Sequence, residues 1–178
     1  VRITAIPAGP NALPIAVAGG PYVMTEGSSV ILNGSASSDS DGTISEYAWD
    51  LDGDGQYDDD TGVTPSFTTT NSGTYIVGLQ VTDNRGDTAT TSVTITVSNA
   101  APTASAGVDQ SSVKGGVVSL SAASSTDPGN DIVSYAWDLN GNGQYTDATG
   151  VNTTFTSAVA GVFIVSVKVT DADGAVSF

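Results

Sequence analysis

The stretch GTYIVGLQVTD (Gly73–Asp83) decides the fold that this chain can adopt. Its large apolar residues stand at every second position: Tyr75, Val77, Leu79 and Val81. Successive side chains of a β-strand point to opposite faces of the sheet, so this alternation is typical of a strand with one buried face. The segment therefore predicts a long strand that covers an apolar core.

The same strand is written a second time, as GVFIVSVKVTD (Gly161–Asp171), within a longer internal repeat. Residues 14–90 align with residues 102–178 without a gap, and about 32 of about 77 aligned positions are identical. A duplicated unit of this length indicates a domain, and the Pro-containing link Ser98–Pro102 indicates the boundary. The predicted organisation has three parts: an N-terminal strand and linker at residues 1–10, a first domain at 11–100 and a second domain at 101–178.

A second alternating segment lies in the middle of each repeat and carries a tryptophan. Tyr47, Trp49 and Leu51 share one face of a predicted strand, and Asp-Gly and Asn-Gly turns follow it. Several short alternating strands joined by such turns favour an all-β fold, with two tandem immunoglobulin-like antiparallel sandwiches and a buried Trp in each. The counterpart of Thr91–Val97 would follow Phe178, so the second sandwich is predicted to lack its own last strand.

Composition narrows the function classes. Lys and Arg total 4 against 19 Asp and Glu, which gives a net charge of −15 and argues against nucleic-acid binding. No apolar run is long enough to cross a bilayer, so membrane insertion is not expected. The sequence has no His and no Cys, and its clustered carboxylates lie in turns without apolar surroundings that would raise a pKa. We therefore expect no enzyme activity.

Two motifs of each repeat resemble the PKD (polycystic kidney disease) domain: Tyr-x-Trp-Asp in mid-domain, and Gly-x-Tyr-x-Val-x-Leu-x-Val-x-Asp-x-x-Gly near the end. The first copy supplies Tyr47, Trp49, Asp50, Gly73, Tyr75, Val77, Leu79, Val81, Asp83 and Gly86; the second supplies Tyr135, Trp137, Asp138, Gly161, Phe163, Val165, Val167, Val169, Asp171 and Gly174. The resemblance implies a seven-stranded immunoglobulin-like sandwich in a surface or secreted protein. Such modules are strung in bacterial and archaeal surface proteins and lie beside the catalytic domains of secreted hydrolases.

An acidic loop after each Trp strand is the first candidate calcium site. Carboxylates at alternate positions followed by glycine can wrap a hard cation. The predicted ligands are Asp50, Asp52, Asp54 and Asp59 in the first copy, and Asp138, Asn140, Asn142 and Asp147 in the second. Thr61 and Thr149 stand where an EF-hand has its bidentate Glu, so this is not an EF-hand. The alternative is a solvated acidic hairpin without metal.

The pole at the start of each module is the second candidate calcium site. In an immunoglobulin-like sandwich the loop before the Trp strand, the last hairpin and the N-terminus lie at one end. The predicted groups are Asp39, Asp41 and Asp83 near Asn11, and Asp127, Asp131 and Asp171 near Asn99. The resemblance supports this site, since some family members bind calcium there, and an ion would stiffen the joint between modules. The alternative is that Asp39 and Asp127 cap turns with their side chains.

Two functions remain open. The leading interpretation is an extracellular structural or adhesive array, such as a filament or surface layer. Its partners would be copies of itself or neighbouring modules, arranged head to tail. In one alternative, Val1–Ile6 of one molecule fills the open edge of the second module of the next molecule. In the other alternative, the chain is an excerpt of a longer array. The alternative is an accessory substrate-binding or spacer module of a secreted enzyme that degrades polysaccharide or protein. Its partner would be a polysaccharide or matrix protein, with Tyr22, Tyr57 and Tyr145 as candidate stacking residues.

Overall fold

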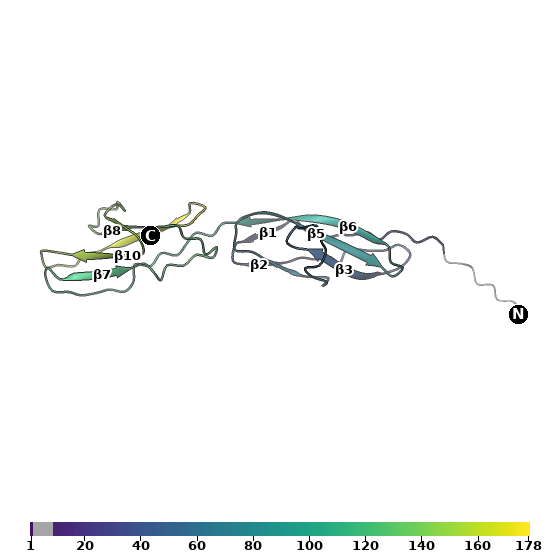
Figure 1. The fold of residues 1–178 in the computed structure, drawn as a ribbon, viewed down its shortest axis with the longest axis horizontal. Helices are drawn as coiled ribbons and strands as arrows, with labels where there is room; N and C mark the ends of the chain where they lie inside the picture. The colour runs from purple at the N-terminus through teal and green to yellow at the C-terminus, as the bar shows by residue number, and fades with distance from the viewer. Residues whose placement is uncertain (2–8) are drawn as a thin grey trace. The chain divides into compact units, whose positions relative to one another are not determined.

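The computed structural model describes residue 1 and residues 9–178, and every regular element in this part of the chain is a β-strand (Figure 1). The chain forms two compact units. The first comprises the described residues up to Met24 together with Ser28–Ser98. The second comprises the turn Thr25–Gly27 together with Asn99–Phe178. The predicted all-β class is confirmed.

The first unit has two sheets. Its strands are β1 (Tyr22–Thr25), β2 (Ser29–Ile31), β3 (Ile44–Asp50), β4 (Ser66–Thr68), β5 (Gly73–Asp83) and β6 (Thr88–Ser98). One sheet has the order β1-β6-β5-β3, and the other is the pair β2-β4. Strands β5 and β6 pair from Gly73 opposite Val97 to Thr82 opposite Thr88, and Figure 1 shows β3 and β6 on either side of β5. The stretch Gly73–Asp83 is thus an inner strand of the larger sheet.

The core of the first unit lies where the alternation predicts it. Val77, Leu79 and Val81 of β5 are fully buried, and Trp49 of β3 is 0% exposed. The indole Nε1 of Trp49 donates a hydrogen bond to the carbonyl of Gly62 at 2.8 Å, so the one polar atom of the ring is satisfied inside the core. Ile76, on the opposite face of β5, is 65% exposed. The sequence prediction of a buried Trp and a one-sided strand is confirmed.

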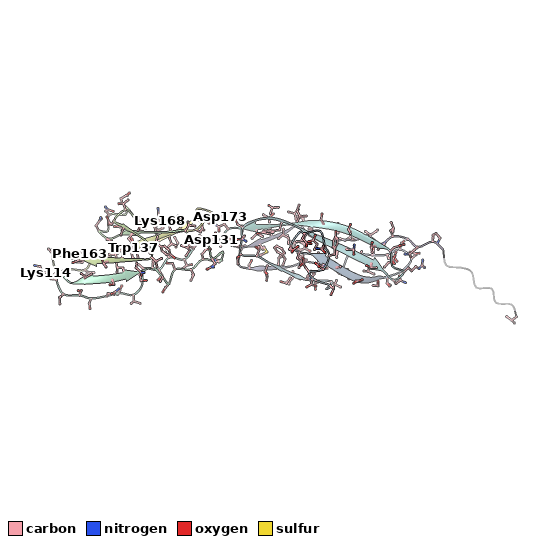
Figure 2. All side chains as sticks on the ribbon, viewed as in Figure 1. Lys114, Asp131, Trp137, Phe163, Lys168 and Asp173 are labelled. Carbon is pink, nitrogen blue, oxygen red and sulfur yellow. The ribbon has the colours of Figure 1, made fainter. Side chains whose placement is uncertain are left out.

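The second unit repeats this plan, with shorter strands in its larger sheet. They are β7 (Val117–Ser121), β8 (Ser134–Asp138), β9 (Ala148–Thr149), β10 (Asn152–Thr156), β11 (Ser166–Thr170) and β12 (Val176–Ser177). The sheet orders are β12-β11-β8-β9 and β10-β7. Trp137 is 0% exposed in the interior (Figure 2), and its Nε1 donates to the carbonyl of Gly150 at 2.9 Å. The two copies therefore build the same core around the same indole contact.

The second sandwich is less complete at one edge. Pairing of β11 with β12 is limited to Val169 opposite Ser177 and Thr170 opposite Val176. Residues 161–165, all of which the structure describes, lie outside any strand, although their counterparts in the first unit begin β5. Strand β12 aligns with the first residues of β6, so the pairing at this edge is shorter in the second unit than in the first.

Candidate metal sites

The acidic loop of the first unit begins where β3 ends. The side chain of Asp50 is 7% exposed, and its carboxylate accepts hydrogen bonds from the N–H groups of Gly53 (2.7 Å) and Gly55 (3.0 Å). Both glycines have positive φ, 76° and 88°, a conformation that other L-residues rarely adopt. Asp50 and the two glycines therefore fold the loop back onto the end of the strand.

Three carboxylates of this loop converge. Oδ2 of Asp59 accepts the N–H groups of Leu51 (2.6 Å) and Asp52 (3.1 Å). Carboxylate oxygens of Asp50, Asp52 and Asp59 lie within 4.8 Å of one another, and among the described residues no other such trio of ligand-type side chains does. Calcium–oxygen distances are about 2.3–2.6 Å, so one ion fits between oxygens at this separation. The loop thus presents a compact set of hard ligands.

Asp54, the fourth predicted ligand of this loop, lies outside the trio. Its Oδ1 accepts the N–H of Gln56 at 2.7 Å, and its Oδ2 accepts the side-chain amide of the same residue at 3.1 Å. Both oxygens therefore serve the turn that Asp54 itself begins. The structure brings together Asp50, Asp52 and Asp59 and leaves Asp54 beside them.

The loop of the second unit has the same backbone but different chemistry. Asp138 accepts the N–H groups of Gly141 (2.8 Å) and Gly143 (2.7 Å), as Asp50 does in the first unit. Burial acts to raise the pKa of Asp138, but the backbone donors, Gly143 first and then Gly141, outweigh it and hold the pKa below its usual value. Asn142 accepts the N–H of Gln144 at 2.7 Å and so repeats the local turn of Asp54.

Asn140 is the residue that separates the two loops. Its Nδ2 donates to both carboxylate oxygens of Asp147, at 2.9 and 2.8 Å. Asp52 occupies the same position in the first unit and has no side-chain donor to offer Asp59. In the second loop the Asn140 amide therefore supplies hydrogen-bond donors to Asp147. In the first loop, two carboxylates face each other at the same positions.

The pole of the first unit contains its own cation. Arg85 donates through Nη1 to Asp41 at 2.8 Å and to Oδ1 of Asn11 at 3.2 Å. Asn11 donates in turn to Asp83 (2.7 Å) and Asp87 (2.8 Å). Burial acts to raise the pKa of Asp83, but the backbone N–H of Arg85 and the Asn11 amide lower it below the usual value. The structure thus gathers Asp41 and Asp83 around Asn11, as the sequence predicts.

Asp39 belongs to the same pole but is held differently. Both of its carboxylate oxygens are buried and find no hydrogen-bond donor among the described residues. The proposed turn-capping role would require such a donor. Asp39 therefore lies at the predicted end of the unit without the capping bond that the alternative interpretation expects.

The pole of the second unit lacks an arginine. Asn99 donates to Asp171 at 3.0 Å, and this bond, acting against burial, holds the pKa of Asp171 below its usual value. Asp127 resembles Asp39, since both of its oxygens are buried and unbonded within the described chain. Oδ1 of Asp131 and the side-chain amide oxygen Oδ1 of Asn99 are also buried and unbonded among the described residues. The predicted group Asp127, Asp131 and Asp171 is gathered around Asn99.

Sequence reasoning missed two residues at these poles. Arg85 was assigned no role, yet its guanidinium pairs with Asp41 at the pole of the first unit. Glu26 was assigned no role, but its side chain is only 2% exposed and its Oε1 accepts the N–H of Ala100 at 3.1 Å. The repeat gives no signal for Glu26, because Lys114 occupies the equivalent position of the second copy.

The tyrosines proposed for stacking on a ligand are occupied by contacts within the chain. The hydroxyl of Tyr22 donates to the carbonyl of Ala18 and accepts the N–H of Asn33, both at 2.9 Å. The ring of Tyr57 packs over Gly78, and the ring centroid of Tyr145 lies 5.1 Å from that of Phe178. Each of these half-buried rings is therefore engaged by contacts within its own unit.

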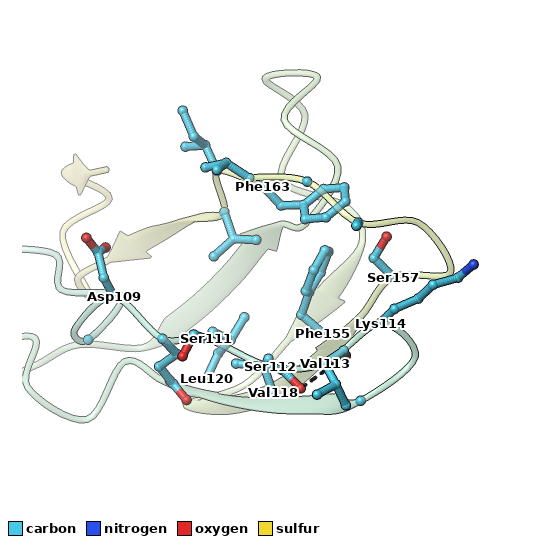
Figure 3. A pocket seen from close by; sticks show the side chains of 18 of the residues that line it. Asp109, Ser111, Ser112, Val113, Lys114, Val118, Leu120, Phe155, Ser157 and Phe163 are labelled. Carbon is cyan, nitrogen blue, oxygen red and sulfur yellow. Dashed lines mark hydrogen bonds between the residues drawn. The ribbon is translucent and has the colours of Figure 1, made fainter.

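A cavity of about 710 Å³ opens in the second unit between residues 106–118 and 155–165 (Figure 3). Its lining includes Leu120 and the tilted ring pair Phe155 and Phe163, whose centroids are 5.2 Å apart. In the first unit, β1 carries Tyr22 and Met24 against the core, whereas Gln110 and Ser112 stand at these positions in the second. Because polar side chains stand at these two positions in the second unit, nothing there fills the cavity as Tyr22 and Met24 fill the core of the first unit.

None of the described residues forms a helix long and apolar enough to span a membrane.

Comparison with curated proteins shows close relatives of single modules. The pre-pro-metalloprotease PrtV of Vibrio cholerae is 45% identical over 78 residues, in each of two strains. This match covers 43% of the present chain and 8% of the length of that protein. The resemblance is therefore to a small segment of a much longer protein.

Solved structures of single PKD domains are also similar to this chain. The PKD1 domain of Vibrio anguillarum Epp is 38% identical, covers 50% of this chain and 98% of that chain, and has a TM-score of 0.42. The PKD1 domain of Vibrio cholerae PrtV is 37% identical, with coverage of 49% and 99% and a TM-score of 0.38. The sequence model of the family described as "PKD domain" matches residues 11–97 and 99–177. The predicted family is thus confirmed across almost the whole sequence: the chain belongs to the PKD domain family.

Proposed function

We propose that this chain is a non-catalytic accessory region of a larger extracellular protein of the secreted protease type. The observation that carries the proposal is the 45% identity of one module to a segment of a pre-pro-metalloprotease. PKD domains are typically non-catalytic modules, which agrees with carboxylates that are engaged by backbone N–H groups in glycine turns. The role would be to space or direct a catalytic domain toward a protein substrate.

The comparisons support this accessory role better than the structural array that the sequence first suggested. The relatives described above include a segment of a metalloprotease and single PKD domains of Vibrio proteins. The strand complementation proposed for Val1–Ile6 concerns residues 2–6, which lie outside the described residues. Head-to-tail polymerisation of the chain is therefore one of the outcomes that the following experiment distinguishes.

The experiment is retention of the purified chain on insoluble substrates. We expect the chain to sediment with collagen fibres and to remain in solution with cellulose and chitin, because each candidate tyrosine is already engaged by contacts within its own unit. Retention on cellulose or chitin alone would favour a polysaccharide-binding module. Formation of large head-to-tail polymers by the chain alone, seen by size exclusion, would favour the array, and either result contradicts the proposal.

We further propose that calcium at the acidic loop of the first unit stabilises the module. The supporting observation is the convergence of Asp50, Asp52 and Asp59 within 4.8 Å. Extracellular calcium is millimolar, and a site with a dissociation constant of ~10⁻⁴ M would then add about 1–2 kcal/mol to the free energy of unfolding. Melting temperatures measured in calcium and in chelator test this. An unchanged melting temperature of the first unit removes calcium from the proposal.

A further inference from the structure

The cavity of the second unit is bordered by two segments whose counterparts form strands in the first unit. Residues 161–165 are the counterparts of Gly73–Val77 at the start of β5, and residues 110–113 are the counterparts of β1. Both segments line the cavity, and neither belongs to a strand. Figure 3 shows Phe163 on one side of the cavity and Val113 on the other. The cavity is therefore flanked by two lengths of backbone with which no strand of the described chain pairs.

The first unit shows what lies between these two segments when the sheet is continuous. There β6 lies between β1 and β5, and it runs antiparallel to β5. Three residues of β6 fill the core: Val93, Ile95 and Val97 are 9%, 0% and 3% exposed. The threonines between them are exposed. One strand with apolar residues at alternate positions thus pairs with both neighbours and closes the core of that unit.

Apolar side chains around the cavity remain exposed to solvent. Phe163 is 44% exposed, although its counterpart Tyr75 packs against the core of the first unit. The other exposed apolar residues of the lining are Val108, Val113, Val159, Val162 and Ile164. A small ligand covers apolar side chains but leaves the neighbouring backbone unpaired. An extended peptide covers both, because its backbone pairs with a sheet edge while its alternate side chains enter the cavity.

We propose that this cavity binds an extended segment of a partner protein, which adds as a strand between residues 110–113 and 161–165 and runs antiparallel to the latter. The segment carries β-branched apolar residues at alternate positions, as Val93–Val97 does in the first unit. Its inward side chains enter the cavity of about 710 Å³ beside Leu120 and Phe155. Its outward side chains face solvent. This site does not depend on the accessory role proposed above.

The rim of the cavity adds a charge preference at one end of the segment. In the first unit the hydroxyl of Ser98, the residue after Val97, donates to the carbonyl of Met24 at 3.3 Å. The counterpart of Met24 is Ser112, two residues before Lys114, which also lines the cavity. Lys114 is exposed and pairs with no carboxylate within the described chain. An acidic residue just beyond the last apolar residue of the segment therefore complements Lys114.

The test is calorimetric titration of the full chain with synthetic peptides. The probe has the sequence of Thr91–Ser98 followed by an aspartate. The matched control carries Val93→Thr, Ile95→Thr and Val97→Thr, which keep the β-branched shape and remove the apolar groups. We expect saturable binding of the probe and roughly tenfold or more weaker binding of the control, because burial of apolar side chains supplies the affinity. A lysine in place of the final aspartate should weaken binding by up to about fivefold.

Hydrogen exchange and one variant of the chain locate the binding surface. The bound probe should slow amide hydrogen exchange at residues 110–113 and 161–165, because those amides gain partners in a ladder. Phe163→Ser should weaken binding of the probe by roughly fivefold or more. Val133→Ser is the matched control, since Val133 is 64% exposed in the same unit and lies outside the cavity lining. The comparison of the two peptides uses the unaltered chain, so it decides the question even where F163S unfolds the second unit.

Three results would overturn the inference. The first is equal affinity of the chain for the probe and for its threonine control, which would show that the apolar positions are not read. The second is binding without slower amide exchange at residues 161–165, which would show adsorption to apolar side chains and no added strand. The third is tighter binding of a peptide with the sequence of Val1–Ile6, which would assign the cavity to a second copy of this chain.

Discussion

A single substitution in each acidic loop can give it the side chain that distinguishes the other loop. Asp52→Asn in the first unit reproduces the side chain of Asn140, and Asn140→Asp in the second reproduces Asp52. In the second unit the Asn140 amide donates to both oxygens of Asp147 at 2.9 and 2.8 Å. We therefore expect D52N to give Asp59 an internal donor and to abolish calcium binding by the first loop.

The magnitude follows from binding linkage. At 1 mM calcium and a dissociation constant of ~10⁻⁴ M, the bound ion adds about 1.4 kcal/mol to the free energy of unfolding. For a unit of this size, that raises the melting temperature by about 6–11 °C. D52N should lose this rise and should melt in chelator at the same temperature as the unaltered chain or higher, because one of three facing charges is gone.

The assay is differential scanning calorimetry of the full chain in calcium and in chelator. N140D is the reciprocal test: the second unit should gain a calcium-dependent rise at its loop and should melt lower in chelator, because Asp147 loses its amide donor. The reasoning is refuted if D52N keeps the full calcium-dependent rise, or if N140D gains none.

Three further predictions concern packing and the loops. Leu79→Ala should destabilise the first unit by about 2–5 kcal/mol, because Leu79 is 0% exposed. Ile76→Thr, on the exposed face of β5, should change the free energy of unfolding by less than about 0.5 kcal/mol. Equal effects of the two substitutions in urea unfolding would contradict the assignment of the buried face. Gly78→Val should cost about 1–3 kcal/mol, since a Cβ there would lie 2.9 Å from Cε1 of Tyr57, and a neutral result would show that Tyr57 does not cover the strand. Asp147→Ala should lower the melting temperature of the second unit equally in calcium and in chelator, because it acts as a hydrogen-bond acceptor; an effect confined to calcium would instead make Asp147 a metal ligand.

The sequence predicts the fold because the alternation of apolar residues and the internal repeat indicate the same architecture. Alternation in Gly73–Asp83 places Val77, Leu79 and Val81 on one face, and these are the residues that the structure buries. Duplication then predicts the second core, including the indole of Trp137. Period and repetition are properties of the chain itself, so they can be read before any contact is known.

The candidate sites are predicted only in part, because the orientation of a polar side chain is not a property of sequence spacing. Asp54 fits the alternating pattern but uses both oxygens within its own turn. Asn140 was expected as a ligand, yet its amide nitrogen faces Asp147. Glu26 has Lys114 as its repeat counterpart, so only the folded chain shows that it is buried beside Ala100.

Calorimetric titration of the metal-free full chain with calcium chloride tests the central claim most directly, namely that the three carboxylates brought together in the acidic loop of the first unit bind calcium. We predict saturable binding that depends on Asp52, with a dissociation constant near ~10⁻⁴ M. The absence of saturable binding, or binding that survives unchanged in the D52N variant, would contradict the account.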